Sequence, residues 1–169
     1  MDAGPAANAH APAHPAVERL TAVSAALGGL LALGVALLVC TSVFGRWLFY
    51  SPVRGDFELV RIATACAVFA YLPYTQARRG NIFVDTFTQR LPARVNAAID
   101  GFWDLVFAAA MAACAYGLWL GAFDSRDSWE TTSELQLQMW PFILFCAGQC
   151  ALLALTAFAT GILRAGARR

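Results

Sequence analysis

A stretch of 26 residues without a charge runs from Leu20 to Gly45. Because an α-helix rises about 1.5 Å per residue, this stretch is long enough to cross the roughly 30 Å hydrocarbon core of a membrane. Only 14% of the 169 residues are charged. Soluble domains carry about 25% charged residues, so the composition also favours a membrane protein. This stretch therefore predicts a helix that spans the membrane, and the rest of the fold must be compatible with it.

Three further apolar stretches predict an all-α integral membrane protein with four transmembrane helices. The expected spans are about 20–44, 57–77, 99–123 and 139–163, within one domain covering 17–165. Residues 1–16 are rich in Ala and Pro and predict a disordered tail, and residues 166–169 form a basic C-terminal tail. Between spans 2 and 3, apolar residues at near-helical spacing predict a short amphipathic segment on the membrane surface. The helix of span 3 begins with an amphipathic part that includes Asp104, expected to project into the interface.

The distribution of basic residues predicts how the chain is oriented. All twelve basic residues are Arg, and eight of them lie in the N-terminal tail, the middle loop and the C-terminal tail. Loops rich in basic residues stay in the cytoplasm, so both termini are expected there. The loop after span 1 and the loop after span 3 then face outward.

The sequence carries no pattern that indicates catalysis, a cofactor or a metal. Both His residues, His10 and His14, lie in the N-terminal tail, where they could not ligate a haem between spans. The five Cys lie inside apolar stretches without a CxxC pair, which favours packing over redox chemistry. A net charge of +1 gives no indication of nucleic-acid binding. No acid lies in the middle of a span, and no span is visibly broken there, so the chain is expected to be an accessory subunit rather than a transporter by itself.

Charged residues gather at the end predicted to face outward. Arg54, Glu58 and Arg61 follow one another at helical spacing and are expected to share one face of span 2. The pattern is compatible with a contact surface for a partner or with ionic groups that only anchor the helix end. The candidate docking residues, which include acids of the second outward loop, are Arg46, Arg54, Asp56, Glu58, Arg61, Asp127 and Glu130, with Asp124, Arg126 and Glu134 in the same loop.

Small residues recur at four-residue spacing in two spans. They are Ser24, Gly28, Ala32, Ala36 and Cys40 in span 1, and Ala109, Ala113, Gly117 and Gly121 in span 3. Small faces let membrane helices approach closely, which makes Gly28 and Ala32 candidates for contact with a partner, although an Ala-rich span would show the same spacing by chance. Gln149 is the one strongly polar side chain deep in a span, and a hydrogen bond to another helix is expected for it.

Several short motifs, in this order, resemble the small membrane subunit (DctQ type) of TRAP transporters, the tripartite ATP-independent periplasmic transporters. They are Gly45-Arg46-Trp47-Leu48-Phe49, Phe57-Glu58-Leu59, the turn from Arg79 to Asp85, and Leu135 to Pro141 followed by Gly148. The likeness covers about residues 17–163. The chain departs from the family at Asn81, where a His is common, so no titrating role is assigned to that position.

The resemblance implies a bacterial inner-membrane protein that is not an enzyme. It implies a sodium-driven symporter in which a large membrane subunit carries a solute, often an organic acid, delivered by a periplasmic solute-binding protein. The small subunit would pack on the large one, surrounded by membrane lipid, and help to present a docking surface. Two alternatives remain open on the residues alone: a four-span scaffold of an unrelated membrane complex, and a redox membrane protein.

Overall fold

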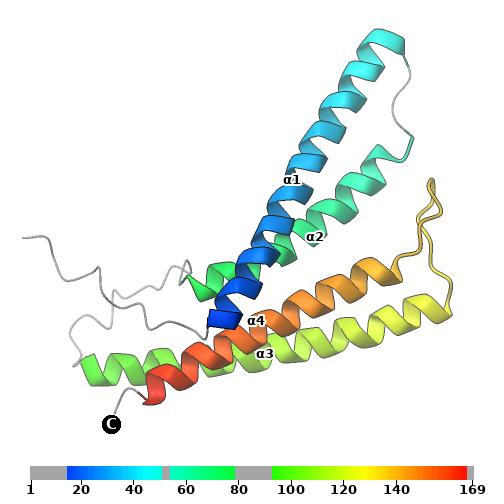
Figure 1. The fold of residues 1–169 in the computed structure, drawn as a ribbon. Helices are drawn as coiled ribbons and strands as arrows, with labels where there is room; N and C mark the ends of the chain where they lie inside the picture. The colour runs from blue at the N-terminus through cyan, green and yellow to red at the C-terminus, as the bar shows by residue number, and fades with distance from the viewer. Residues whose placement is uncertain (1–14, 51–53, 79–92, 167–169) are drawn as a thin grey trace, which may run out of the picture.

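The computed structural model describes residues 15–50, 54–78 and 93–166, and within them the chain forms four long helices (Figure 1). They are α1 (Pro15–Phe49), α2 (Asp56–Ala77), α3 (Ala93–Asp127) and α4 (Trp140–Gly166). Each is long and apolar enough to cross a membrane, which confirms the predicted all-α fold with four spans. α1 begins at Pro15, inside the stretch expected to be a tail; proline is well tolerated in the first turn of a helix. The predicted amphipathic segment lies almost entirely outside the described residues, as does most of the N-terminal tail.

The helices are arranged in the order α1, α2, α4, α3, so α2 and α4 lie inside and α1 and α3 outside. In Figure 1 the two helical hairpins lie together near the end where α1 begins and α4 ends, and they diverge toward the other end. In their most apolar segments, 28% of α2 and 33% of α4 is buried, against 11% for both α1 and α3. The two outer helices therefore leave most of their surface for lipid or for another protein.

The buried face of α1 does not follow the predicted four-residue stripe. Its buried and half-buried positions alternate three- and four-residue steps: Thr21, Ser24, Gly28, Leu31, Val35, Leu38, Ser42 and Gly45. With 3.6 residues per turn, each four-residue step advances about 40° past a full turn, so Cys40 lies about 160° around the helix from Ser24. Ser24 and Gly28 consequently face α2, whereas Ala32, Ala36 and Cys40 are exposed.

At Gly28 the backbones of α1 and α2 come close. A Cβ atom added there would lie 3.1 Å from both the carbonyl oxygen of Ala67 and the Cβ atom of Ala70. One turn away, the Ser24 hydroxyl lies 2.8 Å from the carbonyl oxygen of Ala70 and 2.6 Å from Oε1 of Gln149. These contacts join α1, α2 and α4, and they give Gln149 the hydrogen bond to another helix that its position predicts.

α3 and α4 also approach closely, near the end that holds the C-terminus. A Cβ atom on Gly161 would lie 3.4 Å from the Cβ atom of Asp104, and one on Gly101 would lie 3.7 Å from the carbonyl oxygen of Gly161. Asp104, expected on the polar face that projects into the interface, is instead only 4% exposed. The two glycines remove the side chains that would hold the helices apart, and the close packing that results covers Asp104.

Candidate functional site

The α3–α4 loop, residues 128–139, has a defined structure of its own. The amide of Thr132 donates to the carbonyl of Leu137 at 3.0 Å, and the amide of Met139 donates to the carbonyl of Glu130 at 3.2 Å. An isolated antiparallel bridge joins Thr131 to Gln138. These bonds fold the loop back on itself as a short hairpin. The hairpin connects the end of α3 to the start of α4 and reaches the start of α2 (Figure 1).

Two glutamates join the loop to α2 through reciprocal hydrogen bonds. Glu58, in the first turn of α2, accepts bonds from the amides of Glu134 at 2.8 Å and Leu135 at 3.1 Å. In return, Oε2 of Glu134 accepts a bond from the amide of Gly55 at 2.7 Å. Bonds to a charged acceptor are roughly twice as strong as neutral ones, and the start of a helix favours a negative side chain. We call these three bonds the glutamate clasp.

The clasp depends on a glycine at position 55. Gly55 adopts a φ of 72°, in the left-handed region that side chains disfavour. A Cβ atom there would also lie 2.4 Å from Cγ of Leu135, closer than carbon atoms can pack. The residue that donates to Glu134 therefore also provides the space in which Leu135 packs.

A second link joins the end of α1 to the start of α2. The Ser42 hydroxyl donates to Oδ2 of Asp56, and Nη2 of Arg46 lies 3.8 Å from the same oxygen. The Arg46 side chain is 58% exposed, so its ion pair contributes little stability, whereas the Asp56 side chain is only 16% exposed. Asp56, a predicted docking residue, is thus engaged within the α1–α2 hairpin through Ser42, whereas Arg46, another predicted docking residue, stays largely exposed.

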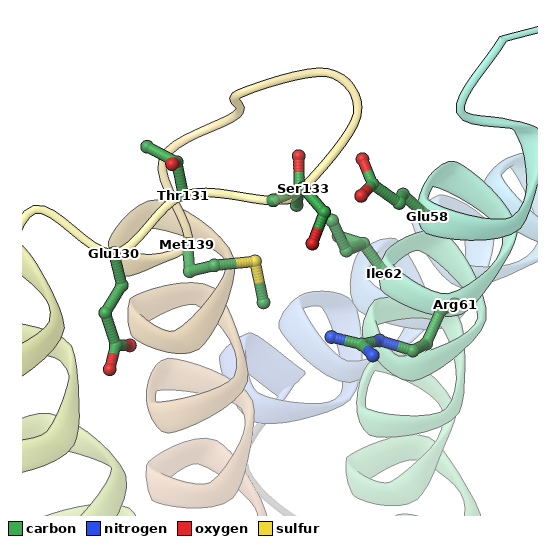
Figure 2. A pocket seen from close by; sticks show the side chains of 8 residues that line it. Glu58, Arg61, Ile62, Glu130, Thr131, Ser133 and Met139 are labelled. Atoms are coloured by element: carbon green, nitrogen blue, oxygen red, sulfur yellow. The ribbon is translucent and has the colours of Figure 1, made fainter.

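Of the predicted ionic face on span 2, the structure keeps only part. Arg54 precedes Gly55 and lies outside α2, so it does not share a helical face with the other two residues. Glu58 and Arg61 are on the helix and line one cavity, which Figure 2 shows from close by. The prediction was wrong for Arg54 because the helix starts two residues later, at Asp56.

The cavity lies between α2 and the α3–α4 loop and has a volume of about 410 Å³. It is lined by Glu58, Arg61, Ile62, Glu130, Thr131, Thr132, Ser133 and Met139. In Figure 2 the Arg61 guanidinium extends from α2 toward the space in front of Met139, and Glu130 lies on the opposite side. The cavity thus brings together two predicted docking residues from distant parts of the chain, and it can hold both a positive and a negative group.

The remaining candidates fall into a covered set and an exposed set. Gly28 and Gln149 are engaged within the chain, whereas Ala32 is exposed, as are Arg54 and Asp127. The row of small residues on α3 is exposed throughout, and a Cβ atom on Gly117 or Gly121 would meet nothing within 4 Å. Sequence reasoning missed the contacts of Ser42 and Leu135. The glycine at position 55 is the one signal of the Leu135 contact, because only a residue without a side chain leaves space there.

One comparison with known proteins is informative. A family model described as the DctQ component of the tripartite ATP-independent periplasmic transporters matches residues 35–165. No curated protein matches the chain. No solved structure matches it either. The matched range contains the second part of α1, all of α2 and α3, and all of α4 except its last residue.

Proposed function

The chain belongs to the DctQ component of the tripartite ATP-independent periplasmic transporters, and we propose that it helps to dock the periplasmic binding protein of a sodium-driven importer. Family membership makes the chain a small membrane subunit of a multi-subunit transporter. The proposal adds three finer points: the docking role, packing on the large membrane subunit, and residence in the bacterial inner membrane with both termini inside. The Arg distribution supports this orientation, because eight of twelve lie on the cytoplasmic side it implies.

The observation that carries the docking proposal is the glutamate clasp. A docking surface must keep its shape between encounters, and the clasp fixes a charged loop on the start of α2 with three hydrogen bonds. Transient partners use charged, solvated contacts that set the rate and the register of encounter. Arg54 and Asp127, exposed at the same end of the molecule, are of this kind.

The face proposed for the large subunit is the exposed side of α3. Membrane helices associate through small residues that allow close backbone approach. Ala109, Ala113, Gly117 and Gly121 provide such a row, and α4 packs against the other side of the helix. Ala32 on α1 is the second candidate, because its side chain is exposed, whereas Gly28 in the same row is covered by α2.

Uptake measurements in reconstituted vesicles test the docking role. The double variant Arg54→Glu with Asp127→Lys reverses two exposed charges and leaves the clasp intact. We expect it to raise the concentration of binding protein needed for half-maximal uptake about three- to tenfold at low salt, because rim charges mainly change the rate of encounter. The yield of the assembled complex should stay normal, and the effect should shrink as salt is added.

The matched control reverses two exposed charges at the opposite end of the molecule, Glu18→Lys with Arg19→Glu. This variant loses the exposed pair of Glu18 with Arg78, 3.4 Å apart, which stabilises the fold very little. If the Arg54 and Asp127 variant takes up solute like this control at every binding-protein concentration, these charges do not dock the binding protein.

A further inference from the structure

Two hollows of different character meet at Ile62. One is the polar cavity of about 410 Å³ beneath the α3–α4 loop. The other is an apolar groove of about 370 Å³ between α1, α2 and α4, lined by Leu31, Leu59, Ile62, Ala63, Cys66, Pro141, Phe142 and Phe145. Because Ile62 lines both, the two hollows adjoin at this side chain, one polar and the other apolar.

The position of this site along the helices matches the layers of a membrane. Glu58 and Arg61 lie in the first two turns of α2, and Thr131 and Ser133 lie in the loop, at the level where lipid headgroups are found. The groove begins beside them and continues past Ala63 and Cys66 on α2 and Phe145 on α4, toward the hydrocarbon core. A molecule that fills both hollows must therefore be amphiphilic and aligned with the lipids.

The lining of the groove suits an acyl chain. All eight lining residues are apolar, and they come from three helices, so a flexible chain lying in the groove contacts α1, α2 and α4 at once.

The charges in the polar cavity are mixed, with both signs available. Arg61 is exposed, and no ion pair is found for it within residues 15–50, 54–78 and 93–166. Both carboxylate oxygens of Glu58 accept bonds from the loop, which leaves Glu130 as the acid on the opposite side of the cavity. Arg is well suited to bind a phosphate, and a carboxylate to bind a primary ammonium group.

We propose that this composite site binds one molecule of phosphatidylethanolamine, with its phosphate on Arg61, its ammonium group facing Glu130 and one acyl chain in the apolar groove. A lipid with a net negative headgroup fits less well, because Glu58 and Glu130 both line the cavity. The bound lipid fills the space between the two helical hairpins where they diverge, and so holds α4 and its loop against α2.

The test uses the complex with the large subunit, reconstituted into vesicles that contain phosphatidylethanolamine with a photoreactive group in its acyl chain. After irradiation, peptide mapping should find labelled lipid on Ala63 of α2 and on Phe142 or Phe145 of α4. Arg61→Ala should lower this labelling about tenfold, the loss of one charge-assisted contact. Arg54→Ala, a matched change outside the cavity, should leave it unchanged.

Two further variants separate the headgroup from the acyl chain. Ala63→Phe fills the groove and should abolish the labelling of α4, whereas Ala65→Phe, exposed on the same helix, should not. Glu130→Gln should remove the preference for phosphatidylethanolamine over phosphatidylglycerol carrying the same photoreactive chain. Equal labelling by both lipids in the unmodified chain would overturn recognition of the ammonium group. Unchanged labelling in Arg61→Ala and Ala63→Phe, or crosslinks to a helix of the large subunit in place of lipid, would overturn the site itself.

Discussion

α1 and α3 are both outer helices of 35 residues, and each carries a row of small residues, yet the two rows have different surroundings. On α1 the row begins at Ser24 and Gly28, where α2 lies close enough to touch a single added carbon. On α3 the whole row faces away from α4, and added carbons at Gly117 and Gly121 would meet only open space. The two rows have the same spacing in the sequence. The row on α1 nevertheless contacts another helix of the chain, whereas the row on α3 is exposed.

The difference depends on which side of each helix packs against its neighbour in the chain. In α3, the buried and half-buried positions alternate three- and four-residue steps: Gly101, Asp104, Ala108, Met111, Ala115, Leu118, Ala122 and Ser125. This series stays on one side because its mean step, about 3.4 residues, is close to one helical turn of 3.6 residues. The small row lies outside it, so α3 meets α4 with one face and retains a second face suited to close approach.

The largest effect within the chain is expected for Gly28→Leu. A side chain there must displace the backbone of α2 at Ala67, and overpacking of this kind costs about 1–3 kcal/mol or more. The isolated chain should unfold at a lower temperature in detergent. The matched control is Gly34→Leu on the same helix, where an added carbon meets nothing within 4 Å. Equal melting of the two variants would show that α1 and α2 are not in close contact at Gly28.

Gly117→Leu should leave the stability of the isolated chain unchanged and weaken its assembly with the large subunit. The isolated chain should melt like the unmodified chain, because the position is open, while the yield of complex with the large subunit should fall by about tenfold or more. Gly148→Leu on α4, which is also open, serves as the control for a bulky residue facing lipid. Normal co-purification of Gly117→Leu would exclude this part of α3 as the assembly face.

A smaller effect is expected for Gln149→Leu, which removes the contact of α4 with Ser24 on α1. Hydrogen bonds between membrane helices contribute about 0.6 kcal/mol on average. A double-mutant cycle with Ser24→Ala, read as thermal unfolding of the isolated chain, should give a coupling energy of this size. A coupling energy of zero would mean that Gln149 and Ser24 are neighbours without stabilising each other.

Much of the fold could be predicted from the sequence because a membrane constrains it strongly. A long uncharged stretch has few alternatives to a spanning helix, and the described residues form four helices that are long and apolar enough to cross a membrane. The four-residue row on α1 was predicted as a surface for a partner, and within the chain only its first members, Ser24 and Gly28, contact α2. The later members turn away because a four-residue pattern rotates around the helix. Buried Asp104 was missed because its burial depends on Gly161, 57 positions later in the chain.

The candidate site was predictable as a set of residues and not as an arrangement. Arg54, Glu58 and Arg61 stood out by charge, but Glu58 is bound by the amides of Glu134 and Leu135. Every residue other than proline has such an amide, so nothing in the sequence distinguishes the two that Glu58 selects. The cavity between Arg61 and Glu130 depends in turn on these bonds, and its existence could not be read from either loop alone.

The glutamate clasp has a consequence for which loop residues can be substituted during evolution. Glu58 recognises main-chain amides, which any residue other than proline would provide at 134 and 135, and only the Glu134 side chain returns a bond to Gly55. The three bonds of the clasp therefore make no use of the side chains at Thr131 and Ser133. Substitution at these two positions leaves the clasp in place. On the docking role proposed above, a few exposed loop residues would set the choice of binding protein while the clasp and the membrane helices remain the same.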